Sequence, residues 1–575
     1  MRAVGIARVA IGLVQGVVLY VLWWAAHDSG KLLQSPALLA AALLVVAYVP
    51  LVGLIGAGSL RLPTLLAWVG VAAAALAGLA IHDVHQQAEG PGSPWPSFAL
   101  WAFVAVGLFI AHHLIAAADV ERRVVASYPR YFEIAWKNGV QIALSALFVG
   151  LFWLVLWLGA ALFGAIGIGG FATFIAKPIF AIPATTVMTA AAVHLTDVRA
   201  GLIRGIRTVV LTLLAWLAPI LAGLATAFLL ALPFTGLEPL WRTRSAAASL
   251  LGAAAALIIL VNAAYQDGQP DDQPPAILRW SARLAAILLL PLVGLAAYAV
   301  WLRVDQYGLT PERVAGVACV VVGACYAIGY AIAALRLAPW LKALEPTNIA
   351  TGVISIAVIL ALFTPLADPV RLSVADQLRR LDAGEVSAAD FDYDFLRFRS
   401  GRYGRDALAQ LVAQGGPAGE NAARTKDKSN EWSLPPRPVI TADQRRANIM
   451  VWPQGRQLPE SFLNQDWNRA SAAADCLTEN KACDAFLADL TGDGREEVLI
   501  RSSFYVIQVY RENGGQWAYI GRLPLDNCGE TILEPLRKGR FVAVPSPFMD
   551  IDVGGIKLRL DTTVATTQRP ECTAR

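Results

Sequence analysis

The chain has 575 residues, of which 56% are hydrophobic and 16% are charged, and its formal net charge is +4. A single soluble core stops growing near ~250–300 residues, and soluble domains carry about 25% charged residues, so the composition excludes one soluble globule. Intrinsic disorder is excluded as well, because it requires a low content of apolar residues. The small net charge gives no support for a nucleic-acid partner.

Charge divides the chain into two parts. Only 34 of the first 367 residues are Asp, Glu, Lys or Arg, about 9%, whereas 56 of the last 208 residues are, about 27%. The first proportion is typical of a membrane domain and the second of a soluble one. We therefore predict an α-helical polytopic bundle over residues 1–367, a helical neck over 368–414, a linker over 415–438 and a soluble mixed α/β domain over 439–575.

Eleven apolar stretches are each long enough to cross a bilayer, which takes roughly 20 residues because the backbone must satisfy its own hydrogen bonds. The segment 164–184 is Gly- and Pro-rich, so it is either a broken span or a re-entrant one, and the count ranges from ten to twelve. The first span follows Arg2 and Arg8, as in a signal peptide, but its length and its Trp23–Trp24 end favour a retained helix. The predicted spans are 6–26, 36–57, 63–81, 97–117, 139–163, 175–196, 207–233, 246–265, 281–302, 313–335 and 347–367.

The orientation follows from the short loops. If the N-terminus is cytoplasmic, 14 Lys and Arg residues lie on the cytoplasmic side and 6 on the other side, as the positive-inside rule requires. An odd number of spans then places the C-terminal domain in the periplasm or at the cell exterior.

The cysteines point to the same side. Cys476, Cys483, Cys528 and Cys572 all lie in the soluble domain, and an even set in an oxidising compartment predicts two disulfides. Pairing Cys476 with Cys483 and Cys528 with Cys572 is one of three arrangements. The alternative is four free thiols in a cytoplasmic domain.

The neck is predicted to be helical. Ser373 is a good N-cap for a helix that runs to Asp382, and a second helix starts at Ser387. A third, short helix is expected over 405–412. In the soluble domain we expect helices near 459–474 and 529–537, and strands near 447–452, 484–489, 496–501, 503–510, 516–522, 540–545 and 555–560.

One loop of the soluble domain has the pattern of a calcium site. From Asp489 to Glu497, oxygen donors stand at positions 1, 3, 5 and 9 and a glycine at position 6, a spacing that wraps a loop around a hard cation. The loop and its strands resemble one FG-GAP-like β-hairpin. A tight Asp-Gly turn is the alternative. Ca²⁺ is the one cofactor that we predict, with the candidate ligands Asp489, Thr491, Asp493, Arg495 and Glu497.

A second candidate site combines histidines and aspartates at the outer ends of the first and third spans. These residue types bind Zn²⁺ or relay protons, although polar residues are also common at the ends of spans. The candidate polar cluster comprises His27, Asp28, His82, Asp83 and His85.

Three segments carry a family resemblance: Asn262–Gly268, Tyr307–Arg313 and Asp390–Gly404. Together they resemble the bacterial membrane proteins of domain-of-unknown-function family 4153, over most of the chain up to about residue 414. The resemblance implies a multi-pass bacterial membrane protein, often with a C-terminal extension. Together with the loop charges, it leads us to predict a protein of the bacterial inner membrane with a cytoplasmic N-terminus and a periplasmic C-terminal domain. It implies no established activity, so no catalytic residue can be transferred.

The sequence leaves three functions open. An envelope anchor or sensor, whose outer domain binds a small molecule or an envelope protein, fits the disulfide-compatible domain and the lack of catalytic motifs. Under this hypothesis the chain binds a ligand and catalyses no reaction. The alternatives are a transporter or flippase, and an enzyme that acts on a lipid-linked substrate at a cleft lined by the polar cluster.

Overall fold

A computed structural model of the chain divides into two compact units, Met1–Glu431 and Trp432–Arg575. The first unit contains the bundle and the neck, and the second contains the soluble domain. The structure describes residues 2–27, 35–87, 95–198, 200–243, 245–269, 274–336, 339–428, 440–467, 473–479, 481–501, 506–524, 533–541, 551–553 and 556–558.

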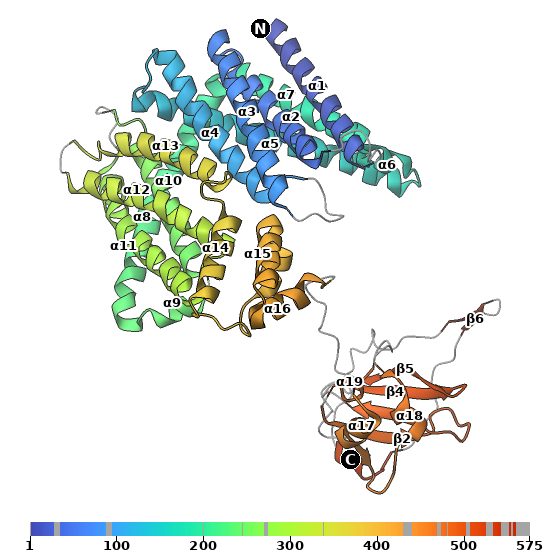
Figure 1. Ribbon diagram of the computed structural model, residues 1–575. Coiled ribbons are helices and arrows are strands. Elements are labelled where there is room, and N and C mark those ends of the chain that lie inside the picture. The colour runs from blue at the N-terminus through green and yellow to red at the C-terminus, as the bar shows by residue number, and fades with distance from the viewer. Residues whose placement is uncertain are drawn as a thin grey trace. The chain divides into compact units, whose positions relative to one another are not determined.

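Eleven helices among the described residues are long and apolar enough to cross a membrane, and they coincide with the eleven predicted spans. The Gly-rich segment is a break between two spans, because α5 ends at Ala165 and the short α6 (Gly170–Ala176) precedes Pro178 of α7. The spanning helices are α1 (Arg2–His27), α2 (Pro36–Gly56), α3 (Leu62–Gln86), α4 (Phe98–Glu121), α5 (Tyr128–Ala165), α7 (Pro178–Val198), α8 (Ala200–Thr235), α10 (Ala246–Tyr265), α11 (Ala276–Tyr307), α12 (Pro311–Leu335) and α13 (Leu344–Leu362). The short α9 (Glu238–Arg242) follows α8 (Figure 1).

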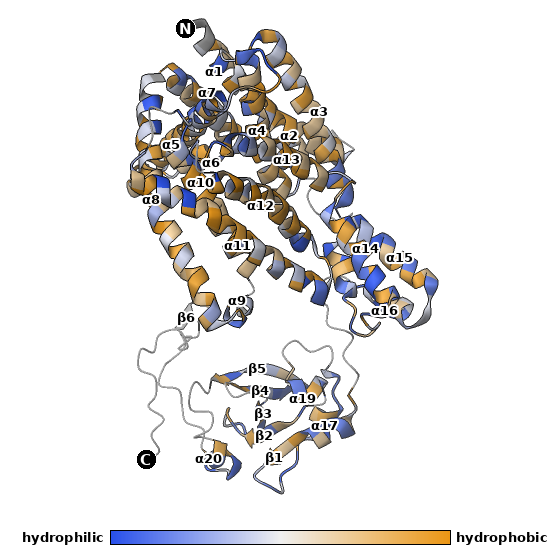
Figure 2. Cartoon of the chain, turned by 90° about the vertical axis from the view of Figure 1, so that its left-hand side faces the viewer, coloured by the Kyte–Doolittle hydropathy of each residue, from blue (hydrophilic) through white to orange (hydrophobic). Residues whose placement is uncertain are grey.

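The outer surface of the bundle is apolar. Large side chains such as Leu154 on α5 and Leu213 on α8 are 63% exposed, and hydrophobic colour covers the long helices in Figure 2. A soluble protein rarely exposes so continuous an apolar surface, which is the surface that lipid covers in a membrane protein. The chain is therefore an integral membrane protein.

Helix α1 packs closely on α7. A Cβ atom added to Gly12 would lie 2.7 Å from Cβ of Ala190, and one added to Gly16 would lie 2.5 Å from Cα of Pro183. Small residues four apart let two membrane helices approach in this way. The first helix is thus part of the bundle, as expected for a retained span.

The first helix of the neck begins earlier than the predicted cap, Ser373. Helix α14 (Pro369–Asp382) is capped by Asp368, whose carboxylate accepts the N–H groups of Val370 and Arg371, while the Ser373 hydroxyl donates to Pro369 O at 2.6 Å. An Asp followed by Pro is the stronger start signal, so the predicted cap was wrong. The rest of the neck comprises the π-turn η2 (Phe395–Arg399), α15 (Gly401–Gln414) and α16 (Gly416–Lys426), and α16 lies inside the predicted linker.

The second unit holds a five-stranded sheet in the order β1-β2-β3-β4-β5. Strand β1 (Ile449–Trp452) is parallel to β2 (Cys483–Ala488), and β3 (Glu497–Arg501), β4 (Val506–Asn513) and β5 (Gln516–Pro524) continue antiparallel. The predicted helix over 459–474 is much shorter, because α18 (Glu460–Asn464) ends where the chain turns to bury Trp467. The smaller elements are α17 (Ala442–Asn448), α19 (Asp475–Thr478), α20 (Leu533–Arg537), β6 (Ile551–Val553) and β7 (Ile556–Leu558).

Candidate functional site

A cavity of about 490 Å³ lies where the membrane helices meet the neck. Its walls come from the end of α3, the start of α4, the start of α12, the end of α13 and the neck elements α14, η2 and α15. Its lining combines polar and apolar side chains, which suits an amphipathic molecule. The polar lining residues are His82, Asp83, Gln86, Gln87, Ser97, Glu312, Asp368 and Arg399, and the apolar ones include Ala99, Phe103, Ala315, Leu362, Phe363, Val370 and Phe398.

His82 and Asp368 form the most buried polar pair of this cavity. Nε2 of His82 lies 3.1 Å from Oδ2 of Asp368, whose side chain is 1% exposed. The other oxygen of Asp368 caps α14, so the carboxylate is fixed by the neck while the imidazole belongs to α3. The Gln86 side chain also contacts Nε2 of His82. The pair therefore links bundle to neck, and it presents a histidine oriented by a buried carboxylate.

Asp83 has a structural role in the same wall. Its carboxylate accepts the Ser97 N–H at 2.7 Å and the Ser97 hydroxyl at 2.9 Å. Ser97 in turn caps α4 by accepting the N–H of Leu100. Asp83 thus holds the start of α4 against the end of α3. Glu312 differs from it, because it is exposed at the start of α12 and its carboxylate is available to a ligand.

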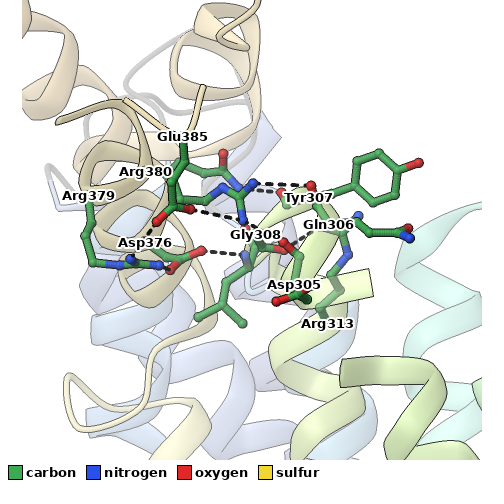
Figure 3. Close-up of polar contacts among 11 residues, drawn as sticks. Asp305, Gln306, Tyr307, Gly308, Arg313, Asp376, Arg379, Arg380 and Glu385 are labelled. Atoms are coloured by element: carbon green, nitrogen blue, oxygen red, sulfur yellow. Dashed lines mark hydrogen bonds and ion pairs between the residues drawn. The ribbon is translucent and has the colours of Figure 1, made fainter. Parts of the chain in front are cut away.

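The neck is clamped onto the α11–α12 loop (Figure 3). Arg380 donates to the carbonyl oxygens of Asp305 at 3.1 Å and Gln306 at 3.2 Å, which are end carbonyls of α11 that lack helical partners. Asp376 accepts the Leu309 N–H at 2.7 Å. Gly308 sits between these contacts at φ +72°, and a Cβ there would lie 2.7 Å from Cδ of Arg380. The loop therefore requires glycine at this position.

Gly401 provides the other close approach of neck and bundle. It has φ +49°, and an added Cβ would overlap the carbonyl oxygen of Gln86 and lie 3.0 Å from its carbon. Since the obstacle is backbone, no change of side-chain rotamer would relieve it. The backbone of α15 thus rests directly on the end of α3.

The structure brings together part of the predicted polar cluster. His82 and Asp83 line the cavity, but His85 is exposed and is not among its lining residues. The ring of His27 stacks on Trp23 at 4.4 Å and lies 6.0 Å from the ring of Trp95. Asp28 lies outside the described residues. Among the described residues, no three His, Cys, Asp or Glu side chains gather as a metal site would require.

Comparison with known proteins assigns the chain to a protein family. The family described as Domain of unknown function (DUF4153) matches residues 37–414. The chain belongs to this family. No curated protein and no solved structure matches the chain.

The C-terminal boundary of the DUF4153 match coincides with the end of a neck helix. The matched region begins at the start of α2 and ends at the last residue of α15, so the bundle from α2 onward, the α11–α12 loop and the neck up to α15 belong to the family region, and α1 lies before it. Residues from 415 onward, including the soluble unit, lie outside it. The cavity beneath the neck is thus built entirely from the family region.

The predicted calcium loop joins β2 to β3. The Asp489 carboxylate accepts the N–H groups of Gly492 at 2.7 Å and Gly494 at 2.9 Å, and these donors lower its pKa. Asp493 accepts the N–H of Arg495 and pairs with Arg511 at 2.7 Å, and its pKa is lowered too. The loop is therefore closed by its own hydrogen bonds, with two ionised carboxylates on an exposed turn.

One of the predicted disulfides is present. Cys476 and Cys483 are bonded, with their Cα atoms 6.0 Å apart. Cys528 and Cys572 lie outside the described residues. The bond joins α19 to the start of β2 in the core of the soluble unit, beside the buried Phe462 and Trp467.

A buried polar ring was not predicted from the sequence. Asn262 accepts from the Tyr128 hydroxyl at 3.1 Å and donates to the Tyr330 hydroxyl at 2.6 Å, and Asn348 donates to Asn262 at 2.7 Å. These contacts join α5, α10, α12 and α13 at the end of the bundle opposite the neck. Isolated polar residues in apolar stretches were the available signal, but their partners are 18 to 220 residues apart in the chain.

Proposed function

We propose that the chain is a binding protein of the bacterial inner membrane that takes an amphipathic ligand into the cavity beneath the neck. The observation that carries this proposal is the shared construction of that cavity, with polar and apolar walls from four membrane helices and three neck elements. Its volume of about 490 Å³ lies within the ~300–1,000 Å³ of small-molecule sites.

Binding of such a ligand would be the signal that the protein senses. It would touch α3, α4, α12 and α13 on one side and α14, η2 and α15 on the other, so its binding free energy would favour the docked neck over an undocked one. The soluble unit follows the neck in the chain, and it is the natural recipient of that change. The loop charges and the Cys476–Cys483 bond support an extracytoplasmic position for this unit.

The test compares two phenylalanine substitutions on α4. Ala99 and Ala102 are both exposed and stand about one turn apart, but only Ala99 lines the cavity. Native mass spectrometry of the full chain released from nanodiscs made with mixed bacterial lipids should show a bound amphiphile in the wild type and in Ala102→Phe, and its loss in Ala99→Phe. Equal retention by both variants would refute the proposal.

An enzyme acting on a lipid-linked substrate is a second candidate. The observation in its favour is the 3.1 Å contact between His82 and the buried Asp368, because an oriented imidazole is the usual general base. A turnover that depends on this pair should disappear in His82→Gln and persist in His85→Gln, measured by mass spectrometry of lipid extracts incubated with each protein. Identical lipid profiles in the presence and absence of the wild-type protein would count against catalysis. The transporter or flippase alternative stays a prediction.

A further inference from the structure

A second cavity, of about 610 Å³, lies inside the bundle between α2, α4, α5 and α7. Its lining is almost wholly apolar, with side chains such as Leu51, Leu108 and Val149. Ala105 on α4 and Gly150 on α5 line it and are exposed on the surface that lipid covers. The cavity can therefore be entered sideways from the bilayer through a rim of small residues.

Two buried histidines break the apolar lining. His112 and His113 on α4 are each 6% exposed, their rings stand 6.4 Å apart, and Nε2 of each has no hydrogen-bond partner. The hydroxyl of Ser145, on α5, lines the same cavity and is also unpartnered. Buried polar atoms are almost always hydrogen-bonded, so three unpartnered ones around one cavity call for a polar group from a bound molecule.

The protonation of His112 follows from its neighbour. The indole N–H of Trp68 can only donate, and it lies 3.3 Å from Nδ1 of His112. Nδ1 is therefore the acceptor of a neutral imidazole, and Nε2 carries the proton. His112 thus presents a hydrogen-bond donor without an acceptor.

His113 has the opposite arrangement. Its Nδ1 contacts the carbonyl oxygen of Phe109, which can only accept, so Nδ1 carries the proton. Nε2 of His113 is then a bare acceptor. The two histidines together offer one donor and one acceptor in a mostly apolar cavity, whose lining also includes Asn138, Ser145 and Thr189.

We propose that this cavity binds a single aliphatic chain whose neutral head both accepts and donates a hydrogen bond, namely a long-chain carboxylic acid in its protonated form or a primary alcohol. The head accepts from Nε2 of His112 and donates to Nε2 of His113, and the chain fills the apolar remainder. This site is separate from the cavity beneath the neck and does not depend on its function. An acyl chain without such a head would leave both imidazoles unpaired.

The ligand's side of the proposal is tested with three probes of the same chain length. Tritiated palmitic acid, 1-hexadecanol and methyl palmitate are bound to the full chain in detergent at pH 5. The ester accepts but cannot donate, so we expect it to bind roughly tenfold more weakly than the acid, the alcohol or both. Tighter binding of the acid or of the alcohol shows whether the natural ligand carries a carboxylic acid or a hydroxyl head group. Ester binding equal to both others would overturn the proposal.

The protein's side is tested with a matched pair of glycine substitutions. Neither Gly150 nor Gly78 has an atom within 4 Å of an added Cβ, so both sites tolerate a side chain, but only Gly150 lines the cavity. Gly150→Leu should lose binding and Gly78→Leu should keep it. His113→Phe should abolish the difference between acid and ester. Because that ratio is measured within one protein, it is informative even if the variant is less stable, and an unchanged ratio would refute the role of His113.

Discussion

Replacing Gly401 with alanine should release the neck from the bundle. The added Cβ would overlap the carbonyl oxygen of Gln86, at the point where α15 rests on α3. The residue also has φ +49°, a conformation that costs an L-residue about 1–2 kcal/mol. Gly401→Ala therefore combines a backbone penalty with a steric conflict that only a displacement of α15 can relieve.

A second glycine of the neck separates the free-energy cost of the steric conflict from the cost of the backbone conformation. Gly384 has φ +73° and no atom within 4 Å of an added Cβ, so Gly384→Ala carries the backbone penalty alone. Overpacking costs typically 1–3 kcal/mol, which corresponds to roughly a 5- to 150-fold change in the ratio of docked to undocked neck. This factor is the expected difference between the two variants.

Hydrogen–deuterium exchange of the full chain in nanodiscs measures that ratio. We expect the amides of α15 to exchange roughly 5- to 150-fold faster in Gly401→Ala than in Gly384→Ala. If the two variants exchange at equal rates in α15, the close approach of Gly401 to Gln86 does not hold the neck, and the reasoning fails.

Three further predictions concern other parts of the chain. Asn262→Leu removes the centre of the polar ring and should lower the free energy of unfolding by about 1–3 kcal/mol, seen as a lower midpoint of thermal unfolding in detergent; an unchanged midpoint would show that the ring adds no stability. The lowered pKa of Asp489, caused first by the Gly494 N–H, gives the loop a stability that is present above the unfolded pKa and is lost as the pH falls through the folded value. Below about pH 4, the loop amides should therefore exchange faster than at neutral pH, and this acceleration should be absent from an Asp489→Asn variant. Added Ca²⁺ should slow their exchange at pH 7 if the loop holds the ion, and no effect of Ca²⁺ would exclude that site. Protease added to vesicles should remove residues 432–575 only when the extracytoplasmic face is outside, and digestion from the cytoplasmic face would reverse the proposed orientation.

Sequence patterns predicted the membrane helices well because each span is a local property. Roughly 20 apolar residues suffice to define a span, so ranges such as 246–265 match the helix limits, and even the Gly-rich break near Gly170 was visible. The neck helix was misplaced at its start because Ser373 and Asp368 are both good caps. Only the Pro after Asp368 distinguishes them.

The cavities were harder to predict because they depend on packing. His82 and Asp83 were singled out as polar residues at the end of a span, but their partner Asp368 is 286 residues from His82 in the chain. His112 and His113 also stand in an apolar stretch, but what each can bind depends on Trp68 and Phe109, which fix opposite tautomers. Periodicity and composition carry no information about such pairings.

The central claim is that the cavity between bundle and neck holds an amphipathic molecule. The most direct measurement is a cryo-electron microscopy map of the full chain in nanodiscs of bacterial lipid, at a resolution that separates side chains. We expect elongated density alongside Phe103 and Phe363, whose rings pack on each other in the cavity wall, with its polar end near His82 and Glu312. A well-ordered cavity that contains only water, or a neck separated from the α11–α12 loop, would contradict it.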